Sequence, residues 1–295
     1  MSLVVNHNLM AANSSRYLNT HYKALSDSTR KLSSGLRVET AADDAAGLAI
    51  RELMRADIAA LNQGVRNAND GISLIQTADG ALGVIDEKLV RMKELAEQAA
   101  TGNYDSTQRL IIDSEYQQMA SEITRIANAT DFNGIKLLDG NLSSDTHDGT
   151  GLVSTGKLKI HFGTANDSAE DYYYIQIGDS TASALGVGNA NGGGAGHDIS
   201  TQANAQKALD AINNAIVSKD NIRAHLGALQ NRLENTITNL EVQSENLQSA
   251  ESQISDVDVA TEMTNFVRNQ ILTQSAVSML GQANSLPQMA LSLIG

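Results

Sequence analysis

The stretch from Gly151 to Lys157 comes closest to a chemical motif, because its glycines and its lysine have the spacing of a phosphate-binding loop. In such a loop a Ser or Thr after the lysine binds magnesium, and the next helix holds the phosphate at its N-terminus. Here Leu158 follows the lysine, and the alternation from Lys157 to Phe162 predicts a strand. We therefore do not expect this stretch to bind a nucleotide.

No other set of residues in the sequence has the spacing of a catalytic or metal-binding site. The histidines are scattered without a metal-ligand pattern, at His7, His21, His147, His161, His197 and His225. The acidic pairs Asp43 with Asp44 and Asp256 with Asp258 are too close in sequence to face each other from one helix, and charge at a helix start explains them better. We expect no catalytic residue, no metal and no cofactor, and hence a protein that is not an enzyme.

The charge balance disfavours anionic partners. Acidic residues outnumber Lys and Arg by 34 to 21, which gives a formal net charge of -13. Nucleic acids and anionic membranes both require a cationic surface, so neither is an expected partner. No window approaches the run of about 18 apolar residues that a transmembrane helix needs. The N-terminus also lacks the pattern of a secretory signal, so secretion would require another export route.

Apolar residues at steps of three and four predict long helices joined by coiled-coil seams. The first seam runs from Ile58 to Ala99, over about six heptads, and Gly102 with Asn103 ends its helix. A second seam runs from Ile112 to Ile126 and ends in a turn cluster at residues 131–134. We expect these two helices to pack antiparallel. Helical spacing returns at Leu209 and continues almost to the single proline, Pro287.

A polar segment, residues 141–202, separates the second and third helical regions. It is rich in Gly, Ser, Thr, Asn and Asp, and the alternating stretches 157–162 and 172–177 predict a β-hairpin. Residues 188–197 are so rich in glycine that we expect them to be flexible and exposed. This insert is expected to face solvent.

The two chain ends have apolar stripes without an obvious cover. Residues 1–32 carry a thin stripe, residues 33–46 are an expected linker, and the far carboxyl end has a broad apolar face. No neighbouring segment of the sequence is placed to bury either stripe. The simplest partner for each terminus is therefore the other terminus.

Several ordered segments of the chain resemble bacterial flagellins. In the amino-terminal half they are Leu32-Ser-Ser-Gly-Leu-Arg37, Ala41-Ala-Asp-Asp-Ala-Ala-Gly-Leu-Ala-Ile50, Arg66-Asn-Ala-Asn-Asp-Gly-Ile-Ser73, Gln76-Thr-Ala-Asp-Gly-Ala-Leu82 and Phe132-Asn-Gly134. Near the other end they are Arg223-Ala-His-Leu-Gly-Ala-Leu-Gln-Asn-Arg-Leu-Glu234, Glu245-Asn-Leu247, Gln282-Ala-Asn284 and Pro287-Gln288. Together these segments span residues 1–140 and 205–295.

The resemblance implies a mainly α fold, an elongated coiled-coil or helical bundle built from both chain termini, with a small β-hairpin insert. Residues 1–40 and 255–295 would form a discontinuous inner-tube coiled coil, and residues 41–140 and 203–254 the outer-tube helical bundle. Residues 141–202 would be the short solvent-facing insert. The segments Tyr174-Ile-Gln-Ile-Gly178 and Ala184-Leu-Gly186 resemble the hairpin of the family's outer tube.

The function that the resemblance implies is that of a structural subunit, which polymerises into the flagellar filament for swimming motility. Such a subunit would be exported by the flagellar type III apparatus and would lie outside the cell in the flagellum. In the polymer, the terminal stripes would pack together. We expect residues 1–40 and 255–295 to be largely disordered in the monomer and to become helical on assembly. The stripe residues are Leu9, Leu18, Leu25, Met263, Val267, Ile271 and Leu280.

The partners that the resemblance implies are further copies of the chain, an export chaperone at the carboxyl terminus, and the filament cap and hook-junction proteins. The family's contacts with an innate immune flagellin receptor map onto Arg91, Leu95 and Glu115, and Val90 stands where many recognised members carry Gln. Two alternatives stay open at this point: a hook-filament junction protein and a secreted binding or adhesion module. Long filaments would favour the filament subunit over both.

Overall fold

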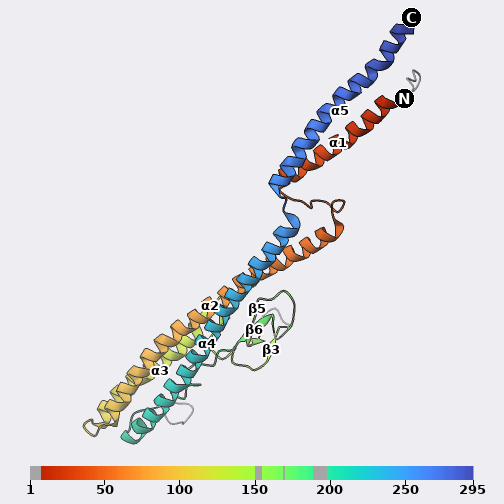
Figure 1. Cartoon of the computed structure of the whole chain (residues 1–295). Coiled ribbons are helices and arrows are strands. Elements are labelled where there is room, and N and C mark those ends of the chain that lie inside the picture. The colour runs from red at the N-terminus through yellow and green to blue at the C-terminus, as the bar shows by residue number, and fades with distance from the viewer. Residues whose placement is uncertain (1–7, 150–154, 169, 189–197, 295) are drawn as a thin grey trace. The chain divides into compact units, whose positions relative to one another are not determined.

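The computed structural model describes residues 8–149, 155–168, 170–188 and 198–294 (Figure 1). The chain forms two compact units, one from residues 1–58 and 245–295 and the other from residues 59–244. We call them the terminal unit and the central unit. The described residues are mainly α-helical with small two-stranded sheets, which confirms the predicted fold class.

Three helices pack side by side in the central unit. They are α2 (Ala45–Ala100), α3 (Ser106–Ala129) and α4 (Gln202–Ser255), of which α2 and α4 begin or end in the terminal unit. Between α2 and α3 the chain turns back, and Asp105 caps α3 in a capping box with Gln108. The predicted antiparallel arrangement is confirmed by side-chain bonds from Arg91 to Glu115 and from Arg109 to the Ala99 carbonyl.

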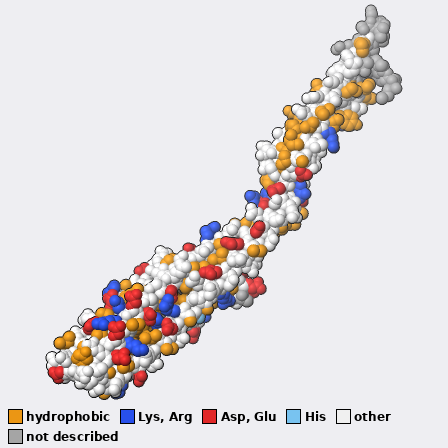
Figure 2. Space-filling view, turned by 60° about the vertical axis from the view of Figure 1, so that its left-hand side comes forward, with side chains coloured by type: hydrophobic (Ala, Val, Ile, Leu, Met, Phe, Trp, Pro, Cys, Tyr) orange, Lys and Arg blue, Asp and Glu red, His pale blue; other side chains and the backbone are white. Residues whose placement is uncertain are grey.

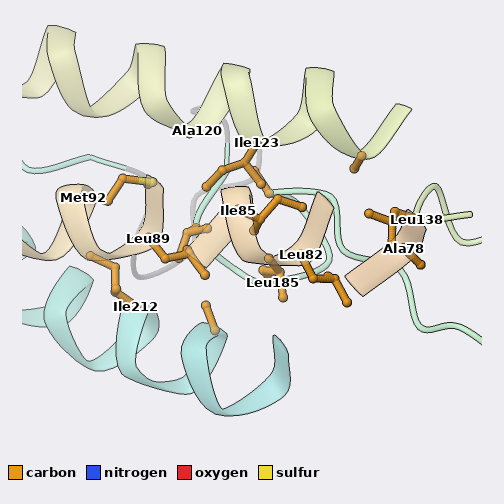
Figure 3. Close-up of a cluster of buried hydrophobic side chains, with 14 of the residues drawn as sticks. Ala78, Leu82, Ile85, Leu89, Met92, Ala120, Ile123, Leu138, Leu185 and Ile212 are labelled. Carbon is orange, nitrogen blue, oxygen red and sulfur yellow. The ribbon is translucent and has the colours of Figure 1, made fainter. Parts of the chain in front are cut away.

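The predicted seam of α2 is the core of the central unit. From Ala78 onward the seam residues at every third or fourth position are fully buried, namely Ala78, Leu82, Ile85, Leu89, Met92, Ala96 and Ala99, whereas Ile58, Val65 and Ile72 are half-buried. Figure 3 shows Ile123 and Ala120 of α3 on one side of this row and Ile212 of α4 on the other. The seams therefore meet each other inside one chain, and their burial is the main hydrophobic stabilisation of this unit.

Short strands lie between α3 and α4. They pair as antiparallel hairpins: β1 (Asp131–Phe132) with β2 (Ile135–Lys136), β3 (His147–Asp148) with β4 (Thr155–Gly156), and β5 (Leu158–His161) with β6 (Tyr172–Ile175). In the first hairpin Asn133 and Gly134 both have positive φ, which is the requirement of a type I′ turn. The hairpin predicted from the two alternating stretches is confirmed as β5 and β6. The predicted Gly-rich stretch lies, apart from Gly188, outside the described residues.

The expectation that the whole insert faces solvent is wrong. Apolar residues of the insert are buried in the same core as the helices, namely Leu142, Ile175, Ile177, Ala182, Leu185, Val187 and Ile199. Sequence reasoning did not assign these residues to the core, because polar residues and glycines separate most of them and the segment as a whole is polar. Parts of the insert thus cover the seam and contribute to the stability of the central unit.

Glycines of α2 let the β5–β6 hairpin lie directly on the helix. A Cβ atom on Gly64 would stand 2.0 Å from the carbonyl oxygen of Phe162, and Gly71 lies against Ile160. Between these glycines, Asn67 donates a 2.8 Å hydrogen bond from its side-chain amide to the carbonyl of His161. The hairpin therefore packs backbone to backbone on α2 at one fixed position.

Replacing Gly64 by Ala should displace the hairpin and destabilise the central unit, although Ala favours helix. The new Cβ overlaps a backbone carbonyl that cannot rotate away, and such overpacking costs roughly 1–3 kcal/mol. Gly80→Ala is the matched control in the same helix, because no atom lies within 4 Å of its would-be Cβ. The control should gain up to about 1 kcal/mol from helix propensity. Urea unfolding of both variants measures the difference, and equal stabilities would contradict this docking.

A buried lysine fixes α4 against α2. Lys219 is 2% exposed, and its ammonium pairs with Asp86 of α2 and with Asp220. One turn away, Arg223 donates to both carboxylate oxygens of Asp79, at 2.7 and 3.1 Å. These hydrogen bonds favour the charged guanidinium and raise the pKa of Arg223. The pairs allow a charged residue in the seam and define which residues of the two helices lie opposite each other.

The terminal unit contains α1 (Leu9–Ser34), which packs along α5 (Val259–Ile294). The helices run antiparallel, because Asn8 at the start of α1 donates to the Ala283 carbonyl while Leu36, after its end, pairs with Asp256. Asn8 also caps α1 by accepting from the Ala11 amide, and Gly35 ends it with a left-handed φ of 72°. The prediction that each terminus is the partner of the other is confirmed.

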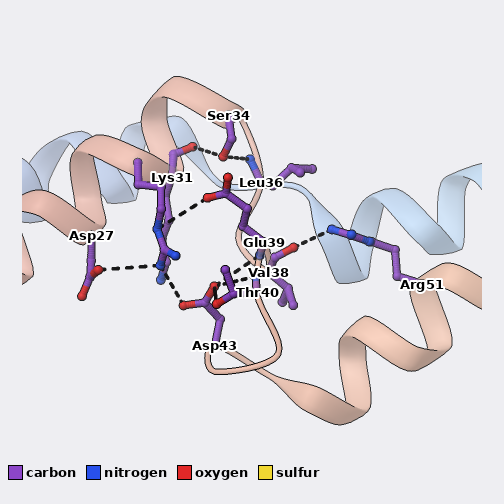
Figure 4. Close-up of polar contacts among 10 residues, drawn as sticks. Asp27, Lys31, Ser34, Leu36, Val38, Glu39, Thr40, Asp43 and Arg51 are labelled. Carbon is purple, nitrogen blue, oxygen red and sulfur yellow. Dashed lines mark hydrogen bonds and ion pairs between the residues drawn. The ribbon is translucent and has the colours of Figure 1, made fainter.

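The linker between α1 and α2 covers residues 35–44 and is held by polar contacts (Figure 4). Asp43 accepts from the Thr40 amide and hydroxyl and pairs with Arg30, and these contacts lower the pKa of Asp43 to about 2. Arg51, which is almost buried, donates to the Val38 carbonyl. Asp44 accepts from the first amides of α2 as predicted for a helix start, whereas Asp43 instead closes the linker.

Candidate assembly surface

The described residues contain no arrangement typical of catalysis or metal binding. No group of three or more His, Asp or Glu side chains is placed there to hold a metal ion. In the phosphate-loop-like stretch, residues 151–154 lie outside the described part, and Gly156 and Leu158 belong to strands β4 and β5. Within the described part of the chain, the helices also lack the combination of length and apolar character that a bilayer span requires.

The seam between α1 and α5 is thin. Of the predicted stripe residues, Leu18 and Leu25 of α1 and Leu280 of α5 are half-buried along this seam. The other half-buried positions of α5 whose burial is described are mostly small or polar, at Glu262, Asn265, Phe266, Asn269, Thr273, Ala276 and Ser285. Ser28 is the one fully buried residue of α1, and Ala283 is the one of α5 among those whose burial is described. The seam thus buries little apolar surface.

The remaining predicted stripe residues do not lie in this seam. Leu9, Met263, Val267 and Ile271 are exposed. Sequence reasoning placed the half-buried and the exposed residues in one stripe. On a helix that is apolar on more than one side, an apolar residue at every third or fourth position can lie on any of those sides, so the spacing does not separate the two sets. The structure separates an intramolecular seam from a second apolar face.

This second face carries more residues than sequence reasoning assigned to it. On α5 the exposed large apolar residues are Val259, Met263, Val267, Ile271, Leu272, Val277, Met279 and Met289, and on α1 they are Leu9, Met10, Tyr17 and Tyr22. Figure 2 shows hydrophobic side chains gathered over this helix pair, with few charged ones. In α5 only Glu262 and Arg268 carry a charge, which was a signal readable from the sequence. We call the exposed apolar residues of α1 and α5 the terminal apolar face.

A face of this kind requires a cover. Monomeric soluble proteins rarely expose large contiguous apolar patches, and a helix that is apolar around its circumference is normally buried on all sides. In the single chain α5 has α1 on one side only. The chemistry of the terminal apolar face is therefore non-covalent association with another apolar helix surface.

The predicted receptor residues are only partly brought together. Arg91 on α2 pairs with Glu115 on α3 at 2.7 Å, and both side chains are exposed, by 48% and 44%. Hydrogen bonds from Arg91 to Glu94 and to Glu115 raise the pKa of Arg91. Leu95 is only 2% exposed, so the expectation that it lies on this surface is wrong. The reason is the phase of α2, in which Leu95 and its neighbours Met92 and Ala96 all face the core.

Comparison with known proteins gives matches along nearly the whole chain. Residues 5–143 match the family model of the bacterial flagellin N-terminal helical region, and residues 209–294 match that of the bacterial flagellin C-terminal helical region. A flagellin of Halalkalibacterium halodurans is 43% identical over 99% of this chain and 100% of its own length. The flagellar filament 33 kDa core protein of Treponema phagedenis is 41% identical with the same coverage.

A solved structure gives a further comparison, of the fold alone. A putative flagellar hook-associated protein from Vibrio parahaemolyticus aligns with a TM-score of 0.55 at 14% identity. The alignment covers 72% of this chain and 100% of that one.

Proposed function

Because this chain belongs to the bacterial flagellin family, we propose that it polymerises through the terminal apolar face of α1 and α5. The chain is a structural subunit of the flagellar filament, the extracellular part of the flagellum. The observation that carries the assembly route is the contrast between a thin α1–α5 seam and the large exposed apolar residues on the other sides of both helices. In a filament, copies of these helices cover one another.

The energetics of this route favour assembly over the free chain. Each large apolar side chain removed from water contributes about 1.5–3 kcal/mol. Fixing the residues of a helix costs conformational entropy, and a single thin seam offsets that cost poorly. Contacts with several neighbouring copies bury more apolar surface, while the number of residues that must be ordered stays the same. In this proposal residues 1–40 and 255–295 form the inner tube, and residues 41–140 and 203–254 form the outer-tube helical bundle.

Seeded growth of the purified chain tests the proposal. Short filament fragments are added to the monomer, and the product is measured by electron microscopy. Long tubes are the expected result and would provide the fibre for swimming motility. Rings or short stubs would instead favour the junction-protein alternative, and monomers at all concentrations would favour a secreted binding module.

The terminal apolar face must also be kept covered before export. Before assembly this face would drive aggregation in the cytoplasm, so we infer that an export chaperone covers α5 until the type III apparatus moves the chain out. At the growing end, the cap and hook-junction proteins would meet the same helices. A chaperone that binds equally well after removal of residues 260–295 would contradict this inference.

The pair Arg91 and Glu115 supports recognition of the monomer by an innate immune flagellin receptor. Arg91→Asp should weaken receptor signalling about tenfold or more. The substitution replaces the exposed positive charge that pairs α2 with α3 by a negative one, and so reverses the charge of this surface. Arg125→Asp is the matched control, since Arg125 is an exposed arginine that pairs with Glu122 in the same unit. Reporter-cell signalling by monomers with equal melting temperatures measures the effect. Equal signalling by both variants would remove Arg91 from the contact surface.

A further inference from the structure

One face of the β5–β6 hairpin lies away from the helical core, and His147 of β3 contacts it at the Tyr174 ring, with 5.5 Å between the two ring centres. The register pairs Lys159 with Tyr174 and His161 with Tyr172, so these four residues share the face opposite to Ile160 and Tyr173. All six side chains are half-buried, but Ile160 and Tyr173 are the two that pack on the helical core. Lys157 extends the face, because its ammonium lies 4.7 Å from the centre of the Tyr174 ring. We call these residues, Lys157, Lys159, His161, Tyr172 and Tyr174, the basic-aromatic face.

The two ammonium groups of this face contact tyrosine rings. The Lys159 ammonium lies 3.6 Å from the centre of the Tyr172 ring and donates a 3.5 Å hydrogen bond to the Asn166 side chain. Among the described residues, no carboxylate lies within 4.0 Å of Lys157 or Lys159. Lys219 in the same unit shows the opposite case, with two carboxylate partners. The tyrosine rings hold the two ammonium groups in place but leave their charge available.

The hairpin also presents this face rigidly. Its backbone rests on Gly64 of α2 and accepts a hydrogen bond from Asn67, and the Ile160 side chain lies against Gly71. On the inner side, the Arg232 guanidinium lies 3.5 Å from the centre of the Tyr173 ring. A binding surface that is already ordered loses little entropy on association.

We infer that the basic-aromatic face binds a carboxylate-bearing surface of a second copy of this chain in the filament. Charge complementarity identifies the occupant. The chain carries 34 acidic and 21 basic residues, so a neighbouring copy presents mostly anionic surface. Exposed acids that form no ion pair among the described residues lie on α2 and α4, as in Glu87, Glu97 and Glu241. The contact offsets part of the repulsion between subunits of net charge -13.

The inference rests on the proposed polymerisation and adds a second, electrostatic contact to the apolar one. Assembly should therefore depend on salt at this face but not at the terminal apolar face. The test measures seeded growth of three double variants. The first carries both Lys157→Gln and Lys159→Gln, and the second carries Arg at the same two positions, which preserves the charge. The third, the control, carries both Lys93→Gln and Lys207→Gln. The control lysines also have no carboxylate within 4.0 Å in the described residues.

The measured quantity is the critical monomer concentration for growth. At about 50 mM salt, two exposed ion pairs per subunit predict a roughly fivefold rise for the double Gln variant. The Arg variant should stay near the wild type, and the control should change less than about twofold. At about 1 M salt, where the Debye length falls to about 3 Å, the difference should disappear.

Three results would overturn the inference in distinguishable ways. Equal growth of the double Gln variant and the control would show that the face makes no contact between copies. A lower melting temperature of the double Gln monomer would show that the lysines only stabilise the hairpin. Normal growth with lost binding to polygalacturonate would assign the face to an acidic polysaccharide instead. Wild-type chain that forms no filaments at all would overturn the proposed polymerisation itself.

Discussion

Leu82→Asp should unfold the central unit at a temperature about 8–16 °C lower than the wild type. Leu82 is fully buried in the α2 seam, where Figure 3 shows it among other aliphatic side chains. An unpaired carboxylate there must either remain charged without water or take up a proton, and both states lose the leucine's packing. The cost is roughly 4 kcal/mol, and about 1 kcal/mol shifts the melting temperature of a unit of this size by about 2–4 °C.

Val84→Asp is the control for this prediction. Val84 lies two residues farther along α2 and is 43% exposed, so its carboxylate stays hydrated. The control should melt within about 2 °C of the wild type, as expected for a surface change near ±0.5 kcal/mol. Circular dichroism at 222 nm measures both variants. Equal melting of Leu82→Asp and Val84→Asp would contradict the assignment of the seam.

The seams were predictable because their signal is local. Steps of three and four from Ile58 to Ala99 define one face of a helix, whatever that face contacts. The same reasoning located the turn after α2 and the helix start at Asp44. The antiparallel pairing of α2 and α3 followed from the short connection between them. Each of these features depends on residues close together in the sequence.

The parts that sequence reasoning missed depend on contacts between distant segments. Ile177 was assigned only to the end of a predicted strand, and Val187 is an apolar residue between two glycines, but both are fully buried in the core that the helices form. Gly64 gave no signal of its own, because its role depends on the Phe162 carbonyl that lies over it. The resemblance assigned Leu95 to a surface, while its position in the seam places it inside. The apolar stripe of a helix can be predicted from the sequence of that helix alone, but the segment that packs against the stripe cannot.

Removing residues 260–295 should leave the central unit folded and abolish filament growth. The deletion takes away all of α5 except its first residue, and with it most of the terminal apolar face. The core of the central unit lies within residues 59–244, so its melting should change little. Seeded growth should fall below detection, because α1 loses both its partner and the surface that neighbouring copies cover. Long filaments from the shortened chain would contradict the proposed assembly route.

A point substitution separates assembly from the loss of a helix. Ile271 is 57% exposed in the single chain, so Ile271→Asp removes no intramolecular packing. In the filament the same carboxylate would lie between apolar helices, where an uncompensated charge costs several kcal/mol per subunit. Growth should therefore stop while the monomer's melting curve stays unchanged. Gln274→Asp, at an exposed polar position of α5, is the control and should still form filaments.

Hydrogen exchange then measures the step at which α1 and α5 gain their stability. The structure has both as helices, but their seam contains Ser28, Asn269 and Thr273 where a stable coiled coil would have leucine or isoleucine. The pair should open often in the free chain, so its amides should exchange much faster than those of the buried α2 seam. In the filament, cover from neighbouring copies should slow exchange in both helices by about a hundredfold or more, as burial of a few apolar side chains per helix predicts. Amides of α5 that are already as protected in the free chain as those of α2 would mean that assembly is not what stabilises the terminal helices.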